Sequence, residues 1–291
     1  MKKAFIALCG VLIFLCGCAV NVPEAQVAAT TLPVYDFATQ ICEGTPITVT
    51  RLITEQVSCL HDYSLNVRQV KAVEAADIVI VSGAGLEDFM ENILKGKITV
   101  DASAGIDLLC AEASHEEEEH EHGHHHESDP HIWLDPNLAS VMAENICLGL
   151  SAQYPEYAPV FEKNCGKLQE SLAELYSYGT QQLQTLRCRE MITFHDGFHY
   201  FADAFDLTIL EAVEEESGSE ASAQELIHLI DLVREHELPA VFTEKSGSVS
   251  AASVLSRETG CRSLALDMGM ADGNYFEAMY HNIDAVKEAL Q

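Results

Sequence analysis

The chain has 291 residues, enough for one large domain or two ordinary lobes, and 48% of them are apolar, so it should fold around a sizeable core. Its 16 Lys and Arg residues stand against 46 Asp and Glu residues, which gives a formal net charge of −30 at pH 7. A chain this negative repels phosphate backbones and anionic lipid headgroups, which excludes nucleic acid as a partner and suits a protein that handles cations.

The N-terminus carries an expected export signal. Two lysines precede the apolar run 4–17, which is too short to span a bilayer of about 30 Å. The run ends in Leu-Cys-Gly-Cys at 15–18, a pattern that resembles a bacterial lipobox and predicts removal of a signal peptide, 1–17, and lipid attachment to Cys18. An ordinary signal peptide with incidental cysteines is the alternative. With 18–25 as a short tether, we expect the chain outside the cell membrane, held there only by its N-terminal lipid.

From residue 26 the chain alternates short β-rich runs with amphipathic helices, and the first such region is 26–154. Near-continuous apolar strands separated by helices predict a parallel sheet that is covered on both faces. A loop rich in His and acidic residues, 112–129, precedes the last helix of this lobe. The expected strands are Val27–Val34, Ile47–Ile53, Asp77–Ser82 and Ile98–Asp101, and the expected helices are 36–42, 65–76, 86–94 and 137–152.

A long helix is predicted next, within a linking segment at 155–187. Between Pro159 and Leu186, apolar or small residues recur at alternating spacings of three and four, which is typical of one helix with a narrow apolar seam. Such a helix would be about 40 Å long, the width of a small domain. Gly166 and Gly179 weaken it and allow a bend.

The alternation of strands and helices resumes in a second lobe, 188–291. The expected strands are 191–194, 208–212, 240–243 and 263–266, and the expected helices are 198–205, 223–237, 250–259 and 275–290. The sequence therefore predicts an α/β protein with two lobes, each on a mainly parallel sheet, joined by one long helix.

Four potential metal ligands follow expected strands, where ligands collect in doubly wound sheets. His61 and His131 come from the first lobe, and His195 and Asp267 from the second. Three imidazoles and a carboxylate suit a tetrahedral Zn²⁺ ion in a cleft between the lobes. Taken singly, each residue has a plainer role, since a His at a strand end is more often hydrogen-bonded than ligating and Asp267 can cap the next helix.

Other polar residues near these positions have a weaker claim to the metal. His199 is interpreted as a helix residue first and an auxiliary ligand second, and Glu244 as a structural residue or one that supports the ligands. The loop 112–129 lacks the apolar residues for a core, and it either concentrates zinc near the cleft or is a solvated insertion with incidental metal affinity. Its histidines are His115, His120, His122, His124, His125 and His126.

Three segments resemble the metal-binding lipoproteins of bacterial zinc and manganese ABC importers: DPHIWLDP at 129–136, TFHDGFHYFADAFDL at 193–207 and ALDMG at 265–269. The resemblance covers essentially the whole mature chain and the His-rich loop. It implies two α/β lobes bridged by a rigid helix, with the ion held between them.

The resemblance also implies a ligand set, and its motifs place the ligands on His61, His131, His195 and Asp267. Manganese-type members tend to have Glu at the third position, so His195 favours Zn²⁺ over Mn²⁺, as does the preference of imidazole for zinc. The chain departs from the family at the first ligand, because a loop with Cys59 replaces the usual Pro-Gly…Pro-His pattern.

We therefore expect a monomeric protein that captures Zn²⁺ outside the cytoplasm and delivers it to an ABC permease and its ATPase. The sequence has no HExxH or GxSxG motif, which argues against a zinc hydrolase and indicates that the chain is not an enzyme. Two alternatives remain at this point: a manganese-type binding protein, and a metal-buffering or adhesin lipoprotein with no transport role.

Overall fold

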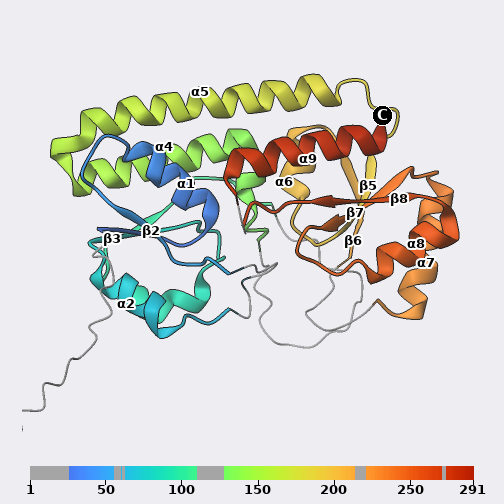
Figure 1. The fold of residues 1–291 in the computed structure, drawn as a ribbon, viewed down its shortest axis with the longest axis horizontal. Helices are drawn as coiled ribbons and strands as arrows, with labels where there is room; N and C mark the ends of the chain where they lie inside the picture. The colour runs from blue at the N-terminus through green and yellow to red at the C-terminus, as the bar shows by residue number, and fades with distance from the viewer. Residues whose placement is uncertain (1–25, 56–59, 61–62, 110–127, 214–220, 271–272) are drawn as a thin grey trace, which may run out of the picture.

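The computed structural model describes residues 26–55, 60, 63–109, 128–213, 221–270 and 273–291. In this part of the chain two α/β lobes lie side by side, and one long helix, α5 (Ala158–Leu183), runs along both (Figure 1). This arrangement confirms the predicted fold class of two parallel-sheet lobes joined by a long helix.

Each lobe is built on a four-stranded sheet whose neighbouring strands are all parallel. The strand orders are β2-β1-β3-β4 and β6-β5-β7-β8, so the winding direction reverses beside the first strand of each sheet, which is where ligands bind in such folds. The strands are β1 (Val27–Ala29), β2 (Val49–Arg51), β3 (Ile78–Val81), β4 (Thr99–Asp101), β5 (Glu190–Phe194), β6 (Thr208–Ala212), β7 (Ala240–Glu244) and β8 (Arg262–Leu266).

Helices cover both faces of each sheet. Helices α1, α4 and α5 pack together over the first sheet, and α9 lies along α5 and also reaches α1 (Figure 1). On the second sheet, α7 and α8 bury their apolar residues against the face opposite α9. The remaining helices are α1 (Leu32–Ile41), α2 (Val67–Ala75), α3 (Glu91–Leu94), α4 (Pro136–Gln153), α6 (His199–Ala204), α7 (Ala223–Glu235), α8 (Ser250–Thr259) and α9 (Tyr275–Leu290), with 3₁₀ turns at Asp88–Met90, Ile132–Leu134 and Pro155–Tyr157.

Two expected elements differ from those observed. The first strand ends at Ala29 rather than Val34, because Thr31 is the extended residue before α1 and Pro33 occupies its first turn, a position that proline favours. The helix expected at 86–94 is a 3₁₀ turn followed by the single helical turn of α3. The other expected strands and helices are present, with ends that differ by a few residues.

Helix α5 runs without interruption through both of its glycines. At Gly179 a Cβ atom would lie 2.3 Å from Cε1 of Phe205 and 3.1 Å from Cδ1 of Ile283, whereas at Gly166 it would meet nothing within 4 Å. Gly179 therefore permits the second lobe to pack directly on the linking helix. Gly179 allows close packing of Phe205 and Ile283 against α5 and does not bend the helix.

Buried hydrogen bonds also connect the two lobes behind α5. Trp133 Nε1 donates to the carbonyl oxygen of Met268 at 2.8 Å, and the Tyr275 hydroxyl donates to the carbonyl oxygen of Trp133 at 2.8 Å. The backbone N–H of Tyr275 donates to Asp36 Oδ2 at 2.7 Å. The first two bonds are buried and the third is part-buried. Separation of the lobes would leave their buried polar groups unpaired, so wide opening is costly.

Across the described residues, no helix is long and apolar enough to cross a membrane.

Candidate metal centre

His131 is held from behind by an acidic side chain. Asp129 Oδ1 accepts hydrogen bonds from the backbone N–H of His131 at 2.9 Å and from its Nδ1 at 2.8 Å, and both residues are buried. This partnership assigns the proton to Nδ1 and leaves the lone pair of Nε2 available as a metal ligand. The other oxygen, Asp129 Oδ2, is buried with no hydrogen-bond partner among the described residues, so negative charge lies close behind the imidazole.

His195 follows β5 in the second lobe and meets His131 across the lobes. The two Nε2 atoms are 3.5 Å apart, and the rings are nearly perpendicular, with an interplanar angle of 82°. Two nitrogens bound at 2.0–2.1 Å to one tetrahedral Zn²⁺ ion lie about 3.4 Å apart. The observed separation therefore fits an ion held between the two imidazoles.

Gly197 allows this close approach. A Cβ atom at that position would lie 2.7 Å from Cδ2 of His195, 2.8 Å from Cε of Met268 and 2.9 Å from Cε1 of His131. Any side chain would displace both imidazoles, so the glycine keeps room for the pair.

Acidic residues surround the pair in the second lobe. Glu244, buried at the end of β7, places Oε2 3.7 Å from Nδ1 of His195, which agrees with a supporting role. Burial and the charge of Asp267 raise the pKa of Glu244 to about 7.

His199, at the start of α6, bonds through Nε2 to Asp196 Oδ1 at 2.7 Å, and this hydrogen bond lowers the pKa of Asp196. The role of His199 as an auxiliary ligand stays a prediction.

Asp267 follows β8 and is rigidly placed. The side-chain amide of Asn282 makes two hydrogen bonds of 2.7 Å to the backbone of Asp267. Its Oδ1 accepts from the N–H, and its Nδ2 donates to the carbonyl oxygen. Asp267 Oδ1 accepts from the backbone N–H of Gly269 at 2.8 Å, and Asp267 Oδ2 accepts from Nζ of Lys245 at 3.0 Å. Both oxygens of this predicted ligand therefore have partners in the protein itself.

The structure brings part of the predicted site together. His131 and His195 meet, but no group of three or more His, Cys, Asp or Glu side chains with metal-binding geometry occurs within the described ranges. His61, the six His residues of the loop 112–129, Cys59 and Cys18 lie outside the described residues. The four-ligand site therefore stays a prediction. Sequence reasoning missed Asp129 and Lys245, although Asp129 begins the DPH motif.

The base of the His-rich segment contacts the second lobe. The backbone N–H of Asp129 donates to the carbonyl oxygen of Leu109 at 3.0 Å, so the two ends of the segment are paired. The Tyr200 hydroxyl, on α6, donates to the carbonyl oxygen of Asp129 at 3.0 Å and accepts from the N–H of Leu109 at 2.9 Å. Leu109 and Asp129 are thereby held beside His131 by contacts from both lobes.

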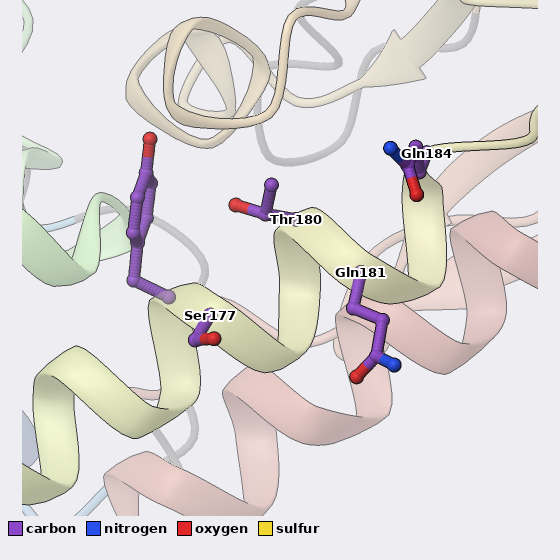
Figure 2. Close-up of a pocket in the computed structure, with 5 residues that line it drawn as sticks. Ser177, Thr180, Gln181 and Gln184 are labelled. Carbon is purple, nitrogen blue, oxygen red and sulfur yellow. The ribbon is translucent and has the colours of Figure 1, made fainter.

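A separate cavity of about 350 Å³ lies on α5 (Figure 2). Figure 2 shows hydroxyl and amide side chains along one stretch of the helix, which are not the ligands that zinc prefers. This cavity is therefore not a metal site. Its lining residues are Tyr176, Ser177, Thr180, Gln181 and Gln184.

Comparison with known proteins gives a consistent result. A family model described as zinc-uptake complex component A, periplasmic (ZnuA) matches residues 27–289. The zinc-binding lipoprotein AdcA of Streptococcus pneumoniae is 29% identical over 99% of this chain, which spans only 61% of the AdcA length. The high-affinity zinc uptake system protein ZnuA of Bacillus subtilis is 29% identical over 98% of this chain and 96% of its own length. The manganese-binding lipoprotein MntA of Bacillus subtilis is 28% identical, with coverage of 92% and 90%.

Solved structures share the fold. The metal-dependent lipoprotein YcdH from Bacillus subtilis superposes with a TM-score of 0.77 at 26% identity, over 91% of this chain and 98% of that one. The laminin-binding adhesin Lmb from Streptococcus agalactiae gives a TM-score of 0.79 at 22% identity, over 92% and 100%. At that identity the second likeness bears on the fold alone.

Proposed function

The chain belongs to the ZnuA family of zinc-uptake components, and from this premise we propose that it captures Zn²⁺ outside the cytoplasm and delivers it to the permease of an ABC importer. The family is one of transport components rather than enzymes. Its relatives include lipoproteins and periplasmic components, which is consistent with an extracytoplasmic location.

The observation that carries the proposal is the pair of imidazoles contributed by different lobes, His131 and His195, with Nε2 atoms 3.5 Å apart. Two imidazole nitrogens at this distance are joined either by one hydrogen bond, with the donor set by the tautomer, or by a cation bound to the lone pair of each. Asp129 behind His131, and Glu244 behind His195 in its ionised form, add negative charge that favours a cation there. We assign His61 and Asp267 as the remaining two ligands.

Zinc is proposed over manganese because nitrogen ligands outnumber oxygen ligands in the proposed set, and imidazole suits zinc whereas carboxylate suits manganese. Because the relative MntA is a manganese-binding lipoprotein, the experiment below also includes Mn²⁺. The six histidines of the loop 112–129 are proposed to hold further Zn²⁺ weakly and to raise its concentration near the cleft.

The remaining parts of the proposal concern the partners. Cys18 would carry the lipid that holds the protein on the outer face of the cell membrane, and the mature chain would act as a monomer that docks on a permease driven by its ATPase. The buried hydrogen bonds between the lobes, such as that from Trp133 to Met268, support loading and release with only a small relative movement of the lobes.

The test is the metal content of the chelator-washed protein from residue 19 onward, measured by mass spectrometry after exposure to Zn²⁺ and Mn²⁺ in equal amounts. We expect one zinc per chain in the wild type and in a variant without 113–128, and none after His195→Ala. A matched His228→Ala variant, whose imidazole on α7 is more than half exposed and lies 3.8 Å from Glu211 Oε2, should keep its zinc. Zinc that disappears with the loop but survives His195→Ala would favour the metal-buffering alternative, and a preference for Mn²⁺ would favour the manganese-type alternative.

A further inference from the structure

Lys245 occupies the oxygen that the predicted ligand Asp267 would offer to a metal. Its Nζ lies 3.0 Å from Asp267 Oδ2, and the other oxygen of that carboxylate is bonded to the backbone N–H of Gly269. The carboxylate is buried, with 9% of its side chain exposed, whereas 60% of the Lys245 side chain is exposed. The ion pair thus joins a fixed anion to a cation that reaches in from solvent.

The backbone places Lys245 at this oxygen. Lys245 directly follows β7, and its N–H donates to the carbonyl oxygen of Leu266 at 2.8 Å, the residue before Asp267. Asn282 fixes the backbone of Asp267, and the backbone N–H of Gly269 donates to Oδ1, so the carboxylate cannot turn away from this position without losing that buried hydrogen bond. The lysine stem, in contrast, is free of the core and can swing outward.

A buried carboxylate is costly unless a cation or hydrogen bonds compensate it. Lys245 supplies that compensation at Asp267 Oδ2. A divalent ion that binds Asp267 Oδ2 would lie within a few ångströms of an ammonium group at the same oxygen, and the two cations would repel each other. Metal binding at Asp267 therefore favours departure of Lys245 from that oxygen.

We infer that Lys245 is an exchangeable counterion, which competes with Zn²⁺ for Asp267 Oδ2 and accelerates release of the metal. The inference rests on the proposed function and assigns to Lys245 the tuning of zinc affinity. The lysine keeps the empty site neutralised and ordered, and it returns to the carboxylate when the metal departs. The site therefore has a lower affinity for Zn²⁺ than its ligands alone would give. A lower affinity allows the metal to be released to a second protein.

The test is a chelator competition that measures the zinc dissociation constant, together with stopped-flow release of Zn²⁺ to excess chelator. We expect Lys245→Met to bind zinc about five- to tenfold more tightly than the wild type, with most of the change in the release rate. Lys167→Met, which removes the same charge from the exposed surface of α5, should change the affinity by less than about twofold. Asp267→Asn should abolish the gain from Lys245→Met in a double-mutant cycle.

A second measurement avoids mutation. In the wild type, acetylation of Lys245 by a small anhydride, followed by mass spectrometry, should be faster in the presence of Zn²⁺ than in its absence, because the ammonium is released from Asp267. Equal or weaker zinc binding by Lys245→Met, or unchanged acetylation on zinc binding, would overturn the inference while leaving the proposed function standing. A wild type that binds no zinc would instead overturn the proposed function and this inference with it.

Discussion

Trp133 Nε1 donates a buried hydrogen bond of 2.8 Å to the carbonyl oxygen of Met268, in the opposite lobe. Trp133 lies two residues after His131, and Met268 lies one residue after Asp267, so the bond joins the segments that carry two predicted ligands. The indole is fully buried, so water does not compete for this hydrogen bond. The relative placement of the two ligand segments is therefore set by the core rather than by the metal.

Replacement of Trp133 by Phe tests this connection. The change leaves the carbonyl oxygen of Met268 unpaired and opens a cavity, so the free energy of unfolding should fall by about 3 kcal/mol, and zinc affinity should fall with it. Urea unfolding of the metal-free protein measures the first effect. Tyr178→Phe, which removes an exposed hydrogen bond to Asp284, should cost less than about 1 kcal/mol. An equal fall in the free energy of unfolding in the two variants would mean that the buried hydrogen bond of Trp133 stabilises the protein no more than the exposed bond of Tyr178 does.

Asp129→Asn tests the support of His131. The asparagine oxygen can still accept a hydrogen bond from Nδ1 of His131. The substitution removes the negative charge behind the imidazole, however, and this makes Nε2 of His131 a poorer ligand. Loss of such partners typically weakens metal binding by about 10- to 100-fold, which a chelator competition at pH 7.5 would detect. The exposed Asp203→Asn variant serves as the control for net charge. Unchanged affinity in Asp129→Asn would show that His131 does not bind the metal through this arrangement.

The two glycines of α5 should respond oppositely to alanine. Gly179→Ala places a methyl group against Phe205 and Ile283 and should destabilise the protein by about 1–3 kcal/mol. Gly166→Ala has open space and should stabilise it by up to about 1 kcal/mol through helix propensity. Thermal or urea unfolding of both variants measures the difference. Stabilisation by both would contradict direct packing of the second lobe on α5.

A buried acid in the first lobe should make stability depend on pH. Burial raises the pKa of Glu87 to about 7, although hydrogen bonds from Thr30 Oγ1 and the backbone N–H groups of Ser82 and Gly83 act to lower it. Between pH 4.5 and 7 the folded protein keeps this proton while the unfolded chain loses it. Stability from this group is therefore fully present below pH 4.5 and is lost as pH rises through 7, by about 3 kcal/mol in all.

Glu87→Gln isolates this effect, because glutamine does not ionise. The free energy of unfolding of the wild type minus that of the variant should fall by about 3 kcal/mol between pH 4.5 and pH 8. Urea unfolding at several pH values gives this difference, and any constant offset from the altered hydrogen bonds cancels. A difference that stays level across this range would show that Glu87 is ionised throughout.

Much of the fold follows from local sequence patterns. The apolar periodicity of α5 and the apolar strands β3 and β7 are signals that a single segment carries, and their positions were predictable. The start of α1 was missed because its apolar residues continue the pattern of β1, and only Pro33 indicated the change. The segment before β4 was overestimated because a helix pattern does not reveal that residues 88–90 form a 3₁₀ turn ahead of the single helical turn of α3.

The candidate ligands of the second lobe, His195 and Asp267, could be proposed from the sequence because each directly follows a strand. The pairing of Lys245 with Asp267 depends on the register of β7 with β8, which no local pattern specifies. The meeting of His131 with His195 likewise depends on how the lobes pack, and Gly197 acquires its meaning only from that packing. Contacts between segments distant in sequence are what the sequence alone could not supply.

The central claim is that one Zn²⁺ ion lies between the imidazoles of His131 and His195. Diffraction from zinc-loaded crystals, with data collected on both sides of the zinc absorption edge, tests it directly in the variant without 113–128. The account predicts one strong anomalous peak about 2.0–2.1 Å from Nε2 of both residues, with His61 and Asp267 completing a tetrahedron. A peak elsewhere, or no peak between the two imidazoles at full zinc loading, would contradict it.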